Sequence, residues 1–185
     1  MSEKIKDDPI TKHHKKMVEK HYKKHFRKKK NEKGWGPDKI YYPNGQVKFE
    51  RFFKDSPFFD RTEKYYYKNG QLQSERTFKD GKEDGTSKYY YDDGQLQMEK
   101  TCKDGKKDGP FRMFDDNGQL KLEETYKDGK QDGPWKIYHN NGKVGVEGTM
   151  KDGKKDGPFK YYYDDGQLQK VRTYKDDEII DSKMY

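Results

Sequence analysis

Four of the five histidines have a spacing that could bind a metal ion. His13, His14, His21 and His25 all lie in the first 34 residues, and His21 and His25 would share one face of a helix. No cysteine or well-placed carboxylate completes a zinc site, and the surrounding lysines repel a cation. We therefore expect no metal site here, and we interpret the segment as a basic helix that is solvated or half-buried.

Two further features could suggest chemistry. The carboxylates of the Lys-Asp-Gly-Lys-Lys-Asp-Gly segments alternate with lysines and lack the spaced ligands and terminal Glu of an EF-hand. Their glycines precede no Lys-Ser/Thr signature of a phosphate-binding loop. Cys102 occupies a position that related segments fill with apolar residues, which favours packing over a reactive thiol. With no nucleophile or acid–base pair in a recognisable setting, we expect a protein that is not an enzyme and needs no cofactor.

The glycines show that the chain is built from a repeated unit of 24 residues. One series, which falls in turns, contains Gly70, Gly94, Gly118, Gly142 and Gly166. Two more series with the same period contain Gly81, Gly105, Gly129 and Gly153, and Gly85, Gly109, Gly133 and Gly157. Three series in one register indicate a stacked-repeat architecture.

Each unit has the pattern of a β-hairpin. In the unit that begins at Gly109, residues 111–115 and 119–126 are the expected strands, joined by Asp116-Asn117-Gly118. The polar segment 127–134 is expected to be a second reversal. Alternation in the second strand separates two faces. They carry Leu120, Leu122 and Tyr126 on one side, and Lys121, Glu123 and Thr125 on the other.

The recurring pattern G-P-[FW]-x-x-[YF]-x-x-x-G-Q-L-x-x-E-x-T-Y-K-D-G-K-x-D-G resembles the variant MORN repeat, including bacterial proteins of the YwqK antitoxin-like type. The resemblance covers about residues 36 to 180. It implies an elongated antiparallel sheet and a binding role rather than a catalytic one. Partners linked to this family are proteins, membrane or phosphoinositide surfaces and, in the antitoxin-like group, a toxin.

Composition and pattern together predict a mostly β protein. Only 28% of the residues are hydrophobic and 41% are charged, which alone would suggest disorder. The 16 Tyr and 10 Phe, however, concentrate apolar area in a few regular positions. We expect an elongated single antiparallel sheet of about six stacked 24-residue hairpins, preceded by one basic N-terminal α-helix and lacking a deep core.

The excess of positive charge lies in an N-terminal arm, residues 1–34, which precedes the repeat array of residues 35–185. The arm holds 13 of the 42 basic and 5 of the 34 acidic residues, leaving 29 of each in the array. Apolar residues at helical spacing in the arm, which include Met17, Val18 and Tyr22, favour a cap over the first hairpin. The alternative is binding of phosphate or anionic lipid. That surface would use Lys16, Lys20, Lys23, Lys24, Arg27 and Lys28.

The terminal units and one inner unit depart from the pattern. Pro43 would interrupt the first strand, as suits a sheet edge. Phe58 and Phe59 replace a lysine and a glycine in the next connection, and packing beneath the arm is the favoured interpretation. Gly145 and Gly148 predict a bulge or a close approach of another backbone. A final strand is expected at residues 178–184.

Aromatic residues at one position of each unit are the candidate binding residues. They are Tyr66, Tyr90, Phe114, Tyr138 and Tyr162. We expect them to bind a protein partner, possible modes being side-chain recognition on a face and strand addition at an edge. The alternative is an adaptor for nucleic acid or anionic phospholipid that binds through the arm. The chain shows no signal-peptide core or membrane span, so a cytoplasmic protein is expected.

Overall fold

The computed structural model describes residues 30–31, 34–35, 38–53 and 60–185. The predicted helix falls almost wholly outside these ranges, as do the six basic residues proposed for an anionic surface and the pair Phe58 and Phe59. The exception is the end of the arm, where β1 (Lys30–Asn31) pairs antiparallel with β2 (Gly34–Trp35). These four residues are therefore extended, and the helix expected before them stays a prediction.

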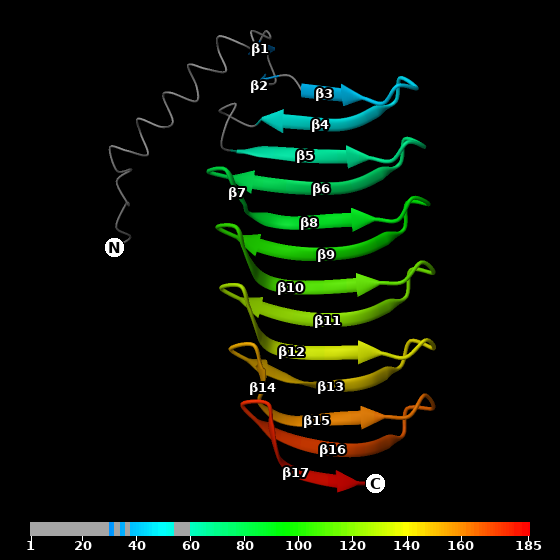
Figure 1. Cartoon of the computed structure of the whole chain (residues 1–185), viewed down its shortest axis with the longest axis vertical. Coiled ribbons are helices and arrows are strands. Elements are labelled where there is room, and N and C mark those ends of the chain that lie inside the picture. The colour runs from blue at the N-terminus through cyan, green and yellow to red at the C-terminus, as the bar shows by residue number, and fades with distance from the viewer. Residues whose placement is uncertain (1–29, 32–33, 36–37, 54–59) are drawn as a thin grey trace, which may run out of the picture.

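All other strands form one open antiparallel sheet of 15 strands, in which the strands follow one another down the long axis (Figure 1). The strands are β3 (Asp38–Tyr41), β4 (Val47–Phe53), β5 (Arg61–Tyr66), β6 (Leu72–Lys79), β7 (Lys82–Glu83), β8 (Gly85–Tyr90), β9 (Leu96–Lys103), β10 (Lys106–Phe114), β11 (Leu120–Lys127), β12 (Lys130–Tyr138), β13 (Val144–Lys151), β14 (Lys154–Lys155), β15 (Gly157–Tyr162), β16 (Leu168–Lys175) and β17 (Glu178–Met184). The short strands β7 and β14 pair with β6 and β13. The expected single sheet of stacked hairpins is confirmed.

The hairpin turns on the right-hand side of Figure 1 form where the sequence predicts them. In the β8–β9 turn, the Tyr91 amide donates to the Gln95 carbonyl (2.8 Å) and the Gly94 amide donates to the Tyr91 carbonyl (3.0 Å). Gly94 has φ 93°, a conformation that glycine adopts without strain. The first glycine series is therefore explained by this turn.

The second reversal is shorter than predicted. β10 begins at Lys106, so the β9–β10 turn consists only of Asp104 and Gly105, with φ 50° and 83°. Two successive positive φ values define a type I′ turn, whose twist matches that of the flanking strands. Aspartate occupies the first position because its short polar side chain tolerates this conformation.

A bulge follows each of these turns and explains the third glycine series. Residues 108–110 of β10 lie opposite the single residue Thr101 of β9. Gly109 has φ 120°, and a Cβ there would lie 3.2 Å from the Thr101 Cβ. The bulge leaves Lys107 above the sheet, with its Nζ 4.2 Å from the ring centre of Phe111 and 4.3 Å from that of Tyr126. Its aliphatic stem covers ring surface while its charge stays near water.

The two faces of the sheet differ in chemistry. Phe111, Met113 and Leu122 lie on what we call the aromatic face, and Arg112 and Glu123 lie on what we call the charged face. The predicted separation of Leu122 from Glu123 is thus confirmed. Leu120 does not continue the row that contains Leu122. A bulge shifts the register there, so that Leu120 lies opposite Phe114, the residue after Met113.

The core lies on the aromatic face and is largest near the C-terminus. Phe159 is fully buried, with ring centres 5.7 Å from Trp135 and 5.1 Å from Tyr174. Burying one such ring contributes roughly 1.5–3 kcal/mol. Cys102 is also buried on this side, and burial raises the pKa of its thiol, in keeping with a packing role.

Hydrogen bonds also join neighbouring units at the hairpin turns. The hydroxyls of Tyr67 and Tyr91 donate to the carbonyls of Tyr90 (2.8 Å) and Phe114 (2.9 Å). His139 takes the same role with its Nε2, 2.9 Å from the Tyr162 carbonyl. Because a carbonyl only accepts, this nitrogen carries the proton. His139 is therefore a structural residue.

The predictions for the irregular units are partly confirmed. β17 spans the expected final strand, and β3 lies at a sheet edge. Pro43, however, lies in the turn after β3, which ends at Tyr41. Gly145 is the extra residue of a bulge that most units share, whereas Gly148 faces a side chain and not a backbone.

We predict that Gly148→Ala destabilises the protein by about 1–3 kcal/mol, because the new Cβ would lie 2.5 Å from the Phe159 ring. Urea denaturation measures the change in the free energy of unfolding. Thr149→Ala, on an exposed neighbouring residue, is the control and should change stability by less than about 0.5 kcal/mol. Equal stability of the two variants would contradict the close fit.

We also predict that His139→Tyr is nearly neutral, since Tyr91 makes the equivalent bond in another unit. His139→Phe keeps an aromatic ring and loses the hydrogen bond, which should lower the stability by about 1 kcal/mol. Thermal unfolding at one pH compares the three proteins. A phenylalanine variant as stable as the tyrosine variant would show that the bond contributes little.

Candidate partner-binding surface

One charged residue from each main strand lines up across the charged face. The register pairs each member with the next, and the sign alternates throughout. This charge ladder contains Lys39, Glu50, Lys64, Glu75, Lys88, Glu99, Arg112, Glu123, Lys136, Glu147 and Lys160. It ends where Val171 of β16 replaces the glutamate of earlier units. Opposite charges placed across a strand pair stabilise a sheet by roughly 0.2–1 kcal/mol each.

Two inner members of the charge ladder contact their neighbours on both sides. Arg112 pairs with Glu99 (3.0 Å) and with Glu123 (2.9 Å). Glu147 lies between Lys136 (3.7 Å) and Lys160 (3.6 Å). Because these side chains are partly exposed, each pair contributes little alone. The main effect of the ladder is that each of its inner charges lies opposite a charge of the other sign.

The predicted binding residues form a column beside the charge ladder. They are Tyr66, Tyr90, Phe114, Tyr138 and Tyr162, all half-buried. The Tyr138 hydroxyl donates to Glu123 (2.6 Å) and the Tyr162 hydroxyl to Glu147 (2.8 Å). Tyr66 donates to Glu50 in the same way (2.9 Å). The sequence did not reveal the carboxylate partners, which depend on strand register, and the role of these rings in partner binding stays a prediction.

These hydrogen bonds fix the protonation of both partners. The bond from Tyr138 lowers the pKa of Glu123, and that from Tyr162 lowers the pKa of Glu147. Burial, reinforced by the same bonds, raises the pKa of Tyr138 and of Tyr162 to about 12. Each phenol is therefore a donor and each carboxylate an acceptor at neutral pH, and these hydroxyls are already engaged within the chain.

The aromatic face carries a continuous row of mainly apolar residues. The register places one residue from each main strand in this row. This apolar stripe contains Ile40, Phe49, Tyr65, Ser74, Tyr89, Met98, Met113, Leu122, Ile137, Val146 and Tyr161. At one strand spacing per residue it is about 50 Å long. Ile40 is 55% exposed, and Met113 and Ile137 are each 40% exposed.

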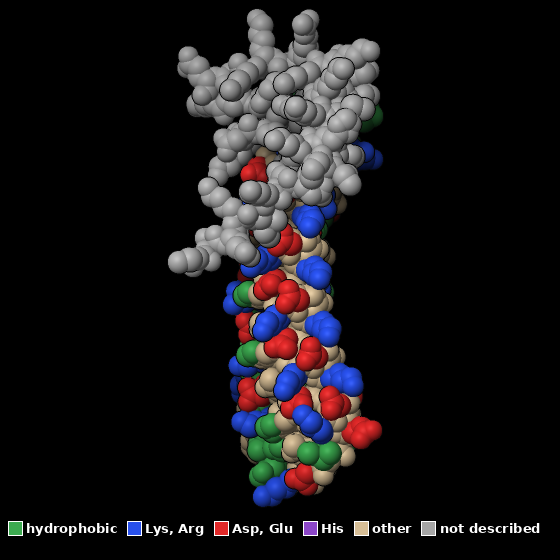
Figure 2. Space-filling model, turned by 90° about the vertical axis from the view of Figure 1, so that its left-hand side faces the viewer, with side chains coloured by type: hydrophobic (Ala, Val, Ile, Leu, Met, Phe, Trp, Pro, Cys, Tyr) green, Lys and Arg blue, Asp and Glu red, His purple; other side chains and the backbone are tan. Residues whose placement is uncertain are grey.

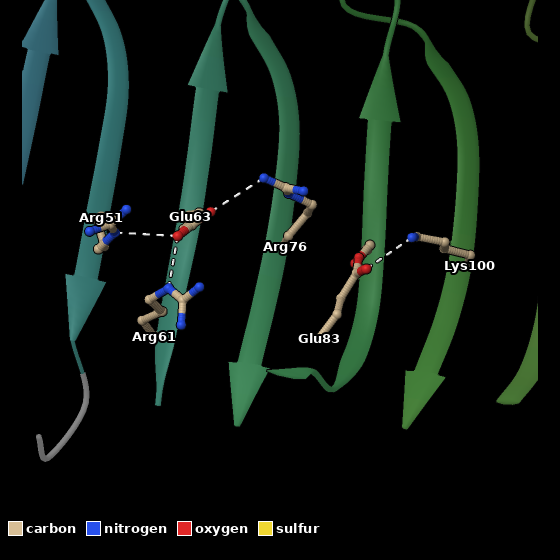
Figure 3. A network of polar contacts seen from close by, with 7 residues as sticks. Arg51, Arg61, Glu63, Arg76, Glu83 and Lys100 are labelled. Carbon is tan, nitrogen blue, oxygen red and sulfur yellow. Dashed lines mark hydrogen bonds and ion pairs between the residues drawn. The ribbon is translucent and has the colours of Figure 1, made fainter. Parts of the chain in front are cut away.

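A charged cluster adjoins the N-terminal half of the apolar stripe (Figure 3). Glu63 is only 4% exposed and contacts Arg51 (3.3 Å), Arg61 (2.7 Å) and Arg76 (3.3 Å). The position of Glu63 is held by Ser87 in the next unit and by Phe111, Trp135 and Phe159 in the later ones. Three cations around one buried anion leave an excess of positive charge. An alignment of the units would have revealed this substitution, although not its partners.

Ser74 creates a slot in the apolar stripe. It is directly opposite Tyr65 on one side and Tyr89 on the other, at a position that holds larger apolar residues in most units. Together with Arg76 these residues line a cavity of about 310 Å³. The Arg76 guanidinium lies 5.2 Å from the Tyr65 ring centre, and its Nη2 donates to Glu63 (3.3 Å). Its Nε is buried without a hydrogen-bond partner in the described structure.

Metal-binding groups and membrane-spanning helices are two other features that a binding protein could carry. The described residues contain no group of three or more His, Cys, Asp or Glu side chains that could hold a metal ion. Within those residues there is also no helix long and apolar enough to cross a membrane.

We predict that Glu63→Gln destabilises the protein by about 3–5 kcal/mol, because three partly buried arginines would lose their shared anion. Urea denaturation measures this loss. Glu75→Gln is the matched control, since Glu75 is more exposed and pairs with Lys64 alone (3.2 Å). The control should lose less than about 1 kcal/mol. An equal loss in both variants would contradict the cluster's role.

Comparison with solved structures gives only a weak likeness. One similar chain, described as "Crystal Structure of TarM", is 13% identical, with a TM-score of 0.35. The match covers 63% of this chain and 23% of that chain, so the present protein spans about a quarter of its length. No curated protein sequence matches.

A family model gives a clear match. The model described as "MORN repeat variant" matches residues 38–55, 62–80, 83–104, 107–128, 131–152 and 155–176, which is more than half of the chain. Each matched segment begins near the start of one strand and ends beyond the next, so the match follows the structural repeat. The protein therefore belongs to the family of variant MORN repeat proteins.

Proposed function

We propose that this protein is a non-catalytic module that binds another protein along the apolar stripe of its aromatic face. The observation that carries the proposal is the continuity of the stripe, with Ile40, Met113 and Ile137 exposed along it. Contiguous apolar surface of this kind on a soluble protein commonly marks a protein interface. A segment lying across the strands could contact every unit.

The charged face is the weaker candidate for this role. Its carboxylates already accept hydrogen bonds from Tyr66, Tyr138 and Tyr162 and pair with neighbouring cations. A partner there would have to replace interactions that the chain makes by itself, at a net loss. Most side chains of the apolar stripe are apolar, although the Tyr161 hydroxyl shares a hydrogen bond with that of Tyr174 (3.0 Å). Covering the stripe removes apolar area from water.

The Ser74 slot supports a more specific partner chemistry. Tyr65, Tyr89 and Arg76 line it, and the Arg76 guanidinium lies 5.2 Å from the centre of the Tyr65 ring. Such a slot suits an apolar side chain followed by a carboxylate, which would stack on the rings and pair with Arg76. We propose that an acidic segment of the partner inserts here.

The biological role suggested by the resemblance to antitoxin-like proteins is neutralisation of a protein toxin. We propose a toxin as the partner, and a cytoplasmic setting for the complex. An acidic, apolar segment of that toxin would occupy the slot. The repeat family supports a binding role, and the identity of the partner rests on the resemblance alone.

A second candidate function follows from the distribution of charge. The whole net charge of +8 comes from residues 1–34, whereas the repeats are neutral. A basic arm of this kind binds anionic lipid or nucleic acid with strong salt dependence. In that case the arm would carry the activity, through Lys16, Lys20, Lys23, Lys24, Arg27 and Lys28, and the sheet would act as a spacer.

Capture of partners from source-cell lysate tests the first proposal. We expect the full chain to retain one protein at high salt, and Ser74→Leu to lower its affinity roughly tenfold or more by filling the slot. Leucine is chosen because Leu122 holds the equivalent position in another unit. Glu75→Gln, on the opposite face of the same strand, is the control and should bind normally.

A third variant separates the two functions. Glutamine at the six basic residues of the arm should leave high-salt protein capture unchanged if the apolar stripe binds the partner. Loss of all binding in this variant, with nucleic acid or lipid retained only at low salt by the native chain, would favour the second function. If the Ser74→Leu variant retained the partner at full affinity, the proposal that the partner inserts into the slot would be wrong.

A further inference from the structure

The outer edge of β17 has an unusual surface. All seven residues of the strand are exposed, including Ile179 at 54%, Ile180 at 64% and Met184 at 66%. Hydrophobic side chains gather at this end of the molecule in Figure 2. β17 pairs with β16 on one side and with no strand of the described chain on the other. Such an edge presents free backbone groups to another strand.

The direction of those backbone groups follows from the pairing with β16. The Tyr185 amide donates to the Gln169 carbonyl (3.0 Å), so residue 185 points its backbone groups toward β16. Backbone groups alternate along a strand, so Asp181 and Lys183 also point inward, whereas Ser182 and Met184 point outward. Any added strand must therefore bond to Ser182 and Met184.

The side chains of Asp181 and Lys183 are charged and have no opposite charge across from them in β16. On the charged face, Asp181 is directly opposite Thr173, and Lys183 is directly opposite Val171. Lys183 contacts the ring of Tyr185, with its Nζ 4.9 Å from the ring centre. In the described residues neither Asp181 nor Lys183 has an ion-pair partner. The pattern of the charge ladder thus breaks off at Val171.

We propose that β17 pairs antiparallel with β17 of a second copy of this chain, about a two-fold axis at Ser182. In this register each Ser182 exchanges both backbone hydrogen bonds with its counterpart. Asp181 of each copy then lies directly opposite Lys183 of the other, as a close non-hydrogen-bonded pair on the charged face. Ile180 lies opposite Met184, so exposed apolar side chains also meet.

Charge selects this register over its neighbours. An axis at Asp181 would place two aspartates opposite each other, and an axis at Lys183 would place two lysines opposite each other. An axis at Met184 would pair Lys183 with Tyr185 and leave Asp181 without a partner. The axis at Ser182 is the arrangement that satisfies both charges and uses the outward backbone groups. The two sheets then join into one, with equivalent faces on the same side.

Sedimentation equilibrium of the full chain, over a range of concentrations, tests the proposal. We expect a reversible monomer–dimer equilibrium. Asp181→Lys and Lys183→Asp should each weaken the dimer roughly tenfold or more, because like charges then lie opposite each other. The double variant Asp181→Lys/Lys183→Asp restores opposite charges in the same register and should recover the native dimer affinity.

Two further variants complete the test. Asp92→Lys changes the net charge as Asp181→Lys does, at an exposed turn far from β17, and should leave the dimer intact. Ser182→Pro removes an outward amide that β16 does not use, and should abolish dimerisation while circular dichroism shows the sheet retained. A chain that stays monomeric at every concentration would overturn the proposal. So would a dimer that the single charge reversals do not weaken, or that the double variant does not restore.

Discussion

The structure depends on one constraint, which is that an aromatic ring on a single-layered sheet can be buried only by its neighbours along the sheet. In the described residues no second layer covers Phe111 or Phe159, yet both are buried. Adjacent strands supply the flanking rings. In two units the second residue after the type I′ turn also lies over a ring, as Lys107 does over Phe111 and Lys155 over Phe159.

The charged face meets the same constraint with a different interaction. Side chains there remain partly in water, so stability comes from cross-strand pairs and not from burial. Alternation of sign means that Arg112, like other inner members of the charge ladder, has an opposite charge on both sides. The tyrosine column adds hydrogen bonds to the glutamates. One face thus holds the sheet together by packing and the other by satisfied polar pairs.

The sequence predicted much of this fold because its signals are local. Glycines with positive φ, such as Gly94, fix the turns, and alternation separates Leu122 from Glu123. It did not reveal the short turn at Asp104, because a bulge after it adds residues that look like loop. The charge ladder, the Glu63 cluster and the Ser74 slot were also missed, since each depends on which residues lie opposite one another. Register is a property of strand pairs, and it became visible only in the structure.

A charge ladder that repeats the same pattern from β3 to β15 has a consequence for folding. A strand displaced by one whole repeat would meet an opposite charge just as well as in its native place, so the ladder cannot distinguish one unit from the next. Features that occur only once in the described repeats can distinguish the units. Among them are the fit of Gly148 against Phe159 and the three arginines around Glu63. The same equivalence would let gene duplication or loss of a unit lengthen or shorten the array while the alternation of charge is kept. Near-identical units thus make the array easy to extend, and its irregular residues give the folding chain a unique alignment.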